Sequence, residues 1–393
     1  MLRATANIVL PTTIIGSLPR PSWYTENLGT RPFLDAMVNS RFREQYTDAV
    51  GSYLRAQELA GLDIVTDGDA RFDEDVGGQS WGTYPTHHMA GFDSSHPKPS
   101  PAGSSGPLYP PGHILHDFLE ARVMPAIVGP VGPGELQYAA LWKTAQRLTK
   151  KPVKFGTITP ELIAMSVRDT YYKDLRERIL AISDALNAEL HTLADAGCPV
   201  IQMEEPQIHL LAAKGMVDKV LNQAFMVEVF NNTVKGLGAK TEVWCHTCWG
   251  NPSQQRLFTK APSYEPALND LNKVEADVVT LECCSSGGLD FKMLGERIKG
   301  KKIAIGVIDH HTLQVETPDQ VAFYIREALK HIPAERLVIC SDCGMGREGM
   351  SRRHAYYKMV SLVQGTNIVR RELGLPEAEC LAADKRYSLT VSA

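Results

Sequence analysis

Short β-branched runs alternate with long amphipathic stretches along most of this 393-residue chain. The clearest helical pattern runs from 174 to 196, where leucine and alanine recur at three- and four-residue spacing before Gly197. Such alternation is typical of a parallel β-sheet, because parallel neighbours need a long crossover connection. The runs expected to be strands are 12–15, 62–66, 126–128, 153–155, 200–203, 241–244, 278–281, 302–307 and 337–340.

Polar or ionisable residues follow almost every one of these runs. A doubly wound sheet and a closed barrel share the alternation, but only a closed ring brings the C-terminal ends of many strands to one point. We therefore expect an α/β fold in which residues 1–393 form a single domain, a (β/α)₈ TIM barrel. The residues at the strand ends are Ser17, Asp67, Asp69, Glu204, Glu205, His246, Cys248, Glu282, Asp309, His310, His311, Asp342 and Cys343.

Residues 92–113 are rich in proline, serine and glycine. The composition predicts a long irregular insertion in the barrel. Loops of this length are uncommon unless they have a function. A lid, an arm in a homo-oligomer and a plain surface excursion are all compatible with it.

The composition is that of an ordinary soluble globular protein, with 44% hydrophobic and 22% charged residues. A net charge of -4 gives no basic field, so we expect no nucleic-acid partner and no membrane partner. No apolar stretch approaches the roughly 18 residues needed to cross a bilayer, and no signal-peptide core is present. We expect a cytoplasmic protein whose 8 cysteines are thiols or metal ligands rather than disulfides.

His246 and Cys248 lie two residues apart at the end of one expected strand, and Glu282 and Cys343 each close a later apolar run. Residues two apart on a strand point to the same face, so the first two can bind one ion together. Two thiolates, an imidazole and a carboxylate suit tetrahedral Zn²⁺. The alternative is that the histidine is a core residue and the cysteines are small buried hydrophobes.

This set of ligands favours a particular chemistry. Two cysteine thiolates and a carboxylate more than cancel the charge of Zn²⁺, so an incoming third thiolate would stay electron-rich enough to attack carbon. Hydrolytic zinc sites are instead dominated by neutral histidines. The ligands therefore favour thiol alkylation, with a closed structural zinc site as the alternative.

Further strand-end residues can serve such a reaction. A histidine can protonate the leaving atom as carbon moves to sulfur, and both His310 and His311 follow Asp309. If strand geometry continues there, only one ring can point inward, and the residues alone do not say which. The carboxylates of Asp69 and Glu204 can bind a substrate ammonium or cap a helix.

The order of these motifs covers nearly the entire chain, from about residue 12 to about residue 371. It resembles the catalytic half of cobalamin-independent methionine synthase. The resemblance implies a (β/α)₈ barrel, a thiol substrate bound to zinc, and His311 as the proton donor near the methyl carrier. It also implies that zinc is held by His246, Cys248, Glu282 and Cys343, and that Ser17, Asp69 and Glu204 hold the amino-acid part of homocysteine. The segments that carry it are 13–19, 67–69, 201–206, 246–248, 280–282, 306–311 and 341–344.

Two positions depart from the family pattern. The chain reads Ala164-Met165-Ser166 where the family carries asparagine, tryptophan and serine against the folate ring, and Glu204 where it carries aspartate. The alkyl donor therefore stays open among methylfolate, a methylated corrinoid protein, an epoxide and a small methylated metabolite.

The function expected from the sequence is a zinc-dependent thiol S-alkyltransferase that takes a small-molecule thiol and an alkyl donor. The leading hypothesis is methyl transfer to homocysteine, because the carboxylates of Asp69 and Glu204 can bind the ammonium group of an amino-acid thiol. Ring opening of an epoxide, as in epoxyalkane:coenzyme M transferase, is one alternative. A zinc-stabilised binding protein without catalysis is the other.

Overall fold

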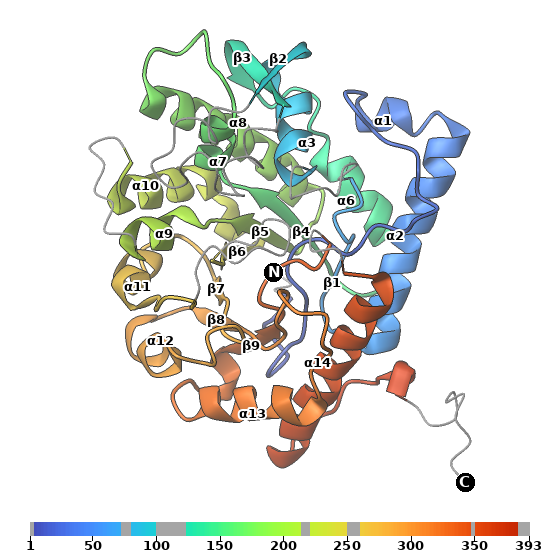
Figure 1. Cartoon of the computed structure of the whole chain (residues 1–393), viewed down its shortest axis with the longest axis vertical. Helices are drawn as coiled ribbons and strands as arrows, with labels where there is room; N and C mark the ends of the chain where they lie inside the picture. Colours follow the sequence, from blue (N-terminus) through green and yellow to red (C-terminus); the bar gives the residue numbers. More distant parts are fainter. Residues whose placement is uncertain are drawn as a thin grey trace.

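The computed structural model describes residues 4–71, 80–99, 123–213, 221–249, 260–346 and 350–383. Within these residues, the centre of the molecule is a 7-stranded parallel sheet in the order β1-β4-β5-β6-β7-β8-β9, with helices around the outside (Figure 1). Consecutive strands are neighbours from β4 onward, as expected for strands joined by helical crossovers. The strands are β1 (Val65–Thr66), β4 (Val153–Ile158), β5 (Val200–Glu204), β6 (Glu242–Thr247), β7 (Val278–Leu281), β8 (Lys302–Gly306) and β9 (Leu337–Cys340).

The sheet is curled, and both of its edges contact the N-terminal segment 11–18. On one side, the Thr13 N–H donates to the Ile339 carbonyl of β9 at 3.0 Å. On the other, the Ile64 N–H just before β1 donates to the Thr12 carbonyl at 3.0 Å. The run 12–15 forms an isolated bridge at Thr12 rather than the regular strand that was predicted. The predicted α/β class is confirmed, and the strands of the curled sheet are parallel as expected.

Helices follow most strands and return the chain along the outside of the sheet (Figure 1). The predicted helix 174–196 is α8 (Leu175–Asp195), which begins where the Asp174 side chain accepts a hydrogen bond from the Glu177 N–H at 3.0 Å. No described helix is both long and apolar enough to cross a membrane. The other helices are α1 (Phe33–Ala36), α2 (Ser40–Ala60), α3 (Ser80–His88), α6 (Tyr138–Gln146), α7 (Pro160–Ser166), α9 (Gln207–Ala213), α10 (Gln223–Val234), α11 (Leu268–Leu271), α12 (Phe291–Arg297), α13 (Pro318–Leu329) and α14 (Arg352–Glu372).

The described residues form two hydrophobic cores, one on each side of the curled sheet. The larger core lies between the sheet and the helices. The smaller one gathers one side chain from each of several neighbouring strands, namely Val200, Trp244, Val278, Ala304 and Val338, all with 0% exposure. These residues pack inside the curl, as in the filled interior of a parallel barrel. The polar residues at the strand ends therefore lie next to an apolar core inside the curled sheet.

A second sheet pairs β2 (Ala90–Pro99) with β3 (Val123–Gly132) in antiparallel fashion. Two predictions are wrong here: the run 126–128 is not in the parallel sheet, and residues 92–99 are a strand instead of irregular chain. Prolines fit this strand because both strands of a two-stranded sheet are edges, and the register shifts between Asp93 and Lys98. Residues 100–113 of the predicted insertion lie outside the described residues.

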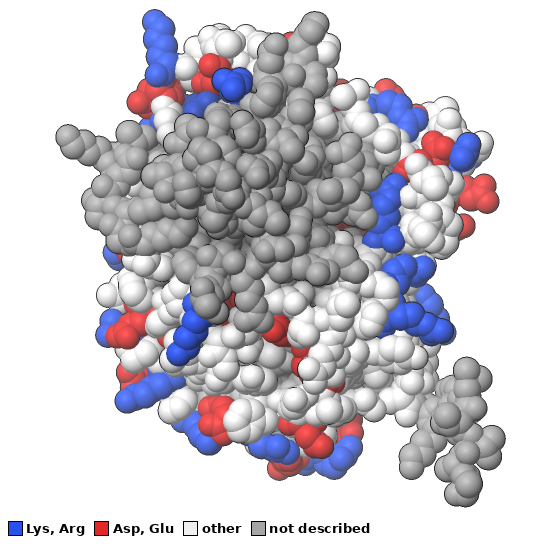
Figure 2. Space-filling view, viewed as in Figure 1, with Lys and Arg blue, Asp and Glu red and all other residues white. Residues whose placement is uncertain are grey.

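The visible face carries both signs of charge. In Figure 2, lysine and arginine side chains alternate with aspartate and glutamate around the rim of the described surface. Interspersed charges do not build the one-sign field that steers nucleic acid or anionic lipid.

Candidate active site

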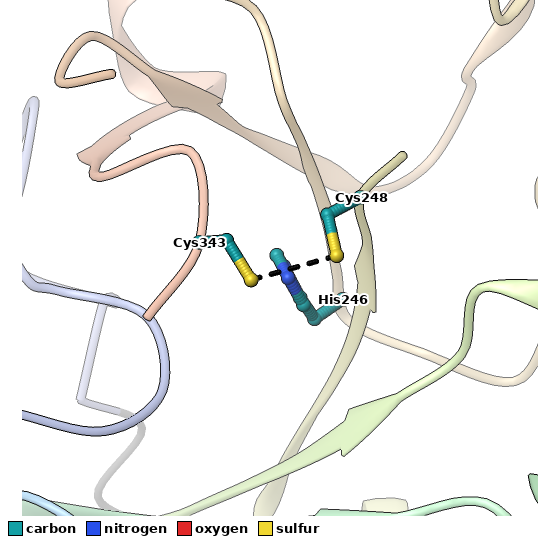
Figure 3. A group of neighbouring side chains, drawn as sticks. All are labelled: His246, Cys248 and Cys343. Atoms are coloured by element: carbon teal, nitrogen blue, oxygen red, sulfur yellow. Dashed lines mark hydrogen bonds between the residues drawn. The ribbon is translucent and has the colours of Figure 1, made fainter. Parts of the chain in front are cut away.

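Three of the predicted metal ligands meet at one end of the curled sheet. His246 is the second-last residue of β6, Cys248 directly follows that strand, and Cys343 lies just after β9. One ligand atom of each lies within 4.8 Å of the others, and the three side chains point toward one another in Figure 3. His246 and Cys343 are buried. The fold thus brings together residues that are about a hundred positions apart in the sequence.

The His246 ring is held by a residue of the next strand. His246 pairs in register with Thr280 of β7, and its Nδ1 lies 2.5 Å from the Thr280 hydroxyl oxygen. The Nε2 atom is buried and makes no hydrogen bond among the described residues. A hydrogen bond at Nδ1 fixes the ring and directs the Nε2 lone pair outward, as metal-binding histidines require.

The two sulfurs of the cluster interact directly. Cys248 Sγ and Cys343 Sγ lie 3.5 Å apart. The hydrogen bond with Cys248 lowers the pKa of Cys343 well below its ordinary value. The same contact, with burial, raises the pKa of Cys248. A lowered pKa favours the thiolate of Cys343, the form of cysteine that binds metals.

The fourth predicted ligand, Glu282, lies next to different partners. One carboxylate oxygen accepts from the Trp249 N–H at 2.8 Å and the other from the Ser285 hydroxyl at 2.5 Å. The carboxylate groups with His310 and His311 rather than with the sulfur cluster. Burial raises the pKa of Glu282 above its ordinary value. Its role as a metal ligand stays a prediction.

His310 and His311 both belong to the site. The chain beyond β8 turns at these residues, so strand alternation ends and both rings offer a nitrogen within 4.8 Å of a Glu282 oxygen. His311 Nδ1 lies 3.0 Å from Asp309 Oδ1. Burial alone would raise the pKa of Asp309, but hydrogen bonds from the His311 ring and N–H lower it to about 2. A carboxylate thus orients the His311 ring.

Glu204 ends β5 beside the cluster. It pairs in register with His246, and its Oε2 lies 3.5 Å from His246 Nε2. Its other oxygen, Oε1, accepts a hydrogen bond from Gln202 Nε2 at 2.7 Å. Burial alone would lower the pKa of His246, yet the Glu204 carboxylate and the Cys343 sulfur raise it. The side chain is 20% exposed, so a ligand can reach it.

Ser17 lies on a loop pressed against the loop that carries Cys343. The Ser17 carbonyl accepts from the Met345 and Gly346 N–H groups, both at 2.8 Å. Gly16 has φ +64°, and a Cβ there would lie 2.9 Å from the Gly344 backbone, so only glycine fits this approach. The Ser17 hydroxyl is buried and without a hydrogen-bond partner among the described residues.

Asp69 lies in a tight turn after β1 with φ +53°. Its N–H donates to Asp67 Oδ1 at 2.9 Å, a local bond that helps an aspartate adopt this left-handed conformation. The turn is further fixed by Arg71, whose Nη1 lies 3.1 Å from Asp69 Oδ1 and 3.7 Å from Asp67 Oδ2. The Asp69 carboxylate is therefore already paired with the Arg71 guanidinium.

Sequence reasoning missed two residues that shape the site, namely Thr280 and Gln202. Each contacts a predicted site residue rather than standing at a strand end as a candidate itself. Aligning the last residues of the adjacent strands, Thr247 of β6 and Leu281 of β7, would have placed Thr280 opposite His246. The orientation of the Gln202 amide and the fold of the 67–71 turn leave no comparable pattern in the sequence.

The sulfur cluster fits a metal ion. It offers one nitrogen and two sulfurs, the donor set that Zn²⁺ prefers. The buried Nε2 of His246 has no hydrogen-bond partner among the described residues, and an unsatisfied buried nitrogen is costly unless a ligand binds it.

The sequence matches the model of a protein family described as cobalamin-independent synthase, catalytic domain. The match covers residues 116–364, which is more than half of the chain. It includes the segments that carry Glu204, His246, Cys248, Glu282, His311 and Cys343.

Individual relatives extend the similarity to most of the chain. It is 29% identical to a methionine synthase of Saccharolobus solfataricus, over 93% of this chain and 96% of that protein. It is also 29% identical to a methionine synthase of Sulfurisphaera tokodaii, over 93% and 94% of the two chains. The fold is similar to a B12-independent methionine synthase from Shewanella sp. W3-18-1, solved with selenomethionine, with a TM-score of 0.75, 27% identity and coverage of 93% and 99%.

Proposed function

Because this chain belongs to the family of cobalamin-independent synthase catalytic domains and is a methyltransferase, we propose that it methylates the thiol of homocysteine with the help of Zn²⁺. The observation that carries this proposal is the meeting of His246, Cys248 and Cys343 within 4.8 Å of one another. Family membership does not support the alternative of a binding protein without catalysis.

In this proposal, His246, Cys248 and Cys343 hold the ion, and Glu282 is the fourth ligand. Zn²⁺, when bound, keeps the acceptor thiol deprotonated at neutral pH so that its sulfur is nucleophilic. Glu282 is the ligand that a substrate sulfur would replace most easily, because a carboxylate is the weakest partner for a thiolate-rich ion. Its hydrogen bonds to Trp249 and Ser285 hold the carboxylate when it is not a ligand.

The amino-acid part of the acceptor would bind beside the cluster. Glu204 Oε2 is directed toward His246, where a carboxylate can bind the substrate ammonium. The buried Ser17 hydroxyl can donate to the substrate carboxylate and so gain the partner it lacks. Asp69, fixed by Arg71, would complete the ammonium site.

His311 is the proposed proton donor. The new bond joins the methyl carbon to the acceptor sulfur while the bond between that carbon and its carrier breaks, and the leaving atom takes a proton from the ring. Asp309 at 3.0 Å stabilises the protonated ring and fixes its orientation. The His310 ring packs against His311 at an interplanar angle of 42°, with the ring centres 4.0 Å apart, which restricts the His311 ring further.

We also propose that segment 11–18 is the eighth strand of a closed (β/α)₈ barrel and that residues 1–393 form one domain. The hydrogen bonds from this segment to β9 and to the residue before β1 support closure. So does Ile15, which is fully buried in the inner core together with side chains of β5 to β9.

The experiment is direct detection of product. Zinc-loaded protein is incubated with homocysteine and, in separate reactions, methyltetrahydrofolate with one or three glutamates, or methylcobalamin, and methionine is measured by mass spectrometry. We expect methionine with at least one donor. The proposal fails if none gives methionine; alkylation of coenzyme M by an epoxide in a parallel reaction would then favour the alternative transferase.

A further inference from the structure

Lys154 is a buried cation that the proposed reaction does not use. It lies on β4 with 2% exposure, inside the curled sheet. Burial lowers its pKa to about 8. An apolar side chain would avoid the cost of placing a charge here, so the position calls for a specific contribution from the lysine.

The three N–H groups of the Lys154 ammonium have three partners. Nζ donates to the Ile14 carbonyl at 2.8 Å and to Gln202 Oε1 at 2.6 Å. It also lies 4.7 Å from the ring centre of Trp244, within the range of a cation–π contact. These partners stand two or three residues before Ser17, Glu204 and His246, respectively.

The contact with Gln202 has a direction that matters. A lysine ammonium only donates hydrogen bonds, so it requires the amide oxygen of Gln202 to face it. The amide nitrogen must then face the other way, where Nε2 donates to Glu204 Oε1 at 2.7 Å. This bond holds one oxygen of Glu204 and leaves the other, Oε2, directed toward His246 Nε2 at 3.5 Å.

We propose that Lys154 is a positioning residue that acts through Gln202 to hold the Glu204 carboxylate ready for the ammonium group of the thiol substrate. This inference rests on the proposed function, in which Glu204 binds that ammonium. Without Lys154, the Gln202 amide can flip and present its oxygen to the carboxylate, which repels it. Lys154, inside the curled sheet, would in this way affect one specific group of the substrate, its ammonium.

The test uses two thiols that differ in that one group. Homocysteine carries the ammonium, and 4-mercaptobutyrate is the same molecule without it. Binding of each to zinc-loaded Lys154→Met protein is measured by calorimetry, with zinc content determined in parallel. We expect homocysteine binding to weaken about tenfold, 4-mercaptobutyrate binding to change less than twofold, and the zinc content to stay equal to that of the wild type.

A matched control makes the same chemical change away from the site. Lys302 begins β8, at the opposite end of its strand, and its Nζ donates to the Thr5 carbonyl at 2.5 Å. Lys302→Met should leave the binding of both thiols within twofold of the wild type.

Gln202→Glu provides a second route if Lys154→Met folds poorly. The new carboxylate keeps an acceptor for Lys154 but removes the N–H that reaches Glu204, so we expect the same selective loss of homocysteine binding. A double-mutant cycle identifies the path: Lys154→Met combined with Glu204→Gln should bind homocysteine no more weakly than Glu204→Gln alone.

Two results would overturn the inference while leaving the proposed function in place. One is an equal loss for both thiols in Lys154→Met and in Gln202→Glu, which would indicate general damage to the site. The other is full additivity in the double-mutant cycle. Wild-type zinc protein that binds neither thiol would instead overturn the proposed function, and the substrate role of Lys154 with it.

Discussion

The sulfur half of the site (His246, Cys248 and Cys343) and the imidazole half (Glu282, His310 and His311) differ in the hydrogen bonds of His246, His311 and Glu282. In the sulfur half, His246 Nε2 is buried without a hydrogen-bond partner among the described residues, and Cys248 Sγ lies 3.5 Å from Cys343 Sγ. In the imidazole half, His311 is bonded to Asp309, and both Glu282 oxygens accept hydrogen bonds. Under the proposed function, a bound ion completes the first half, whereas the second half already holds His311 and Glu282 in place for proton transfer.

The largest expected effect comes from breaking the sulfur half. Cys343→Ala removes one of two thiolate ligands, and we expect zinc content below a tenth of the wild-type value and methyl transfer reduced by more than about 1000-fold. Zinc is measured by elemental analysis after dialysis. Cys245→Ala is the matched control, since Cys245 packs in the outer core and the variant should keep its zinc. Full zinc content in Cys343→Ala would contradict the proposed ligand set.

Breaking the imidazole half should spare the metal. His311→Gln removes the proton donor, and we expect kcat to fall about 100- to 1000-fold while zinc content and homocysteine affinity stay within twofold. The comparison uses steady-state kinetics and calorimetry on one preparation. His191→Gln on the outer face of α8 serves as the control. Loss of zinc in His311→Gln would show that the two halves are not separate.

Glu282→Gln tests whether this carboxylate binds the metal or belongs only to the imidazole half of the site. If this carboxylate becomes a metal ligand, the variant should bind zinc about 10- to 100-fold more weakly, as measured by competition with a chromophoric chelator. An unchanged zinc affinity with a lowered kcat would instead place Glu282 entirely in the imidazole half, where the structure shows it beside His310 and His311.

The smallest effect concerns stability at acid pH. The pKa of Asp309 is lowered to about 2 in the folded protein, so its ionised form stabilises the fold at every pH above its unfolded value of about 4. This contribution is lost as the pH falls from about 4 through about 2. In urea unfolding of zinc-free protein, the stability difference between wild type and Asp309→Asn should shrink by about 1–2 kcal/mol as the pH falls from about 4 to about 2. A constant difference down to pH 2 would contradict the role of His311 in holding Asp309 ionised.

The arrangement of the sulfur half could be predicted from the sequence. Alternating strands and helices require parallel strands, and parallel strands of one sheet end on the same side. Residues at those ends, such as His246, Cys248 and Cys343, come close only if the sheet also curls, because β6 and β9 are not neighbours in it. The polar residues at many strand ends predicted a closed (β/α)₈ barrel, and the described residues form a curled parallel sheet of 7 strands.

Other features depend on side-chain orientation and could not be predicted. Glu282 stands at a strand end like the other predicted ligands, yet Trp249 and Ser285 hold its carboxylate elsewhere. In the sequence, Lys154 and Gln202 are two polar residues within separate apolar runs. Nothing in these runs indicates that the two side chains form a hydrogen bond. The β2–β3 hairpin was missed because proline-rich composition predicts irregular chain, although a two-stranded sheet tolerates proline at its edges.

The most direct test of the central claim is X-ray absorption at the zinc edge, recorded on zinc-loaded protein with and without homocysteine. Cys248 and Cys343 supply two sulfur ligands in the free protein under the proposed function. Homocysteine should raise the number of sulfur ligands from two to three, with the loss of one oxygen ligand. An unchanged sulfur count at saturating homocysteine would contradict thiol activation by the metal.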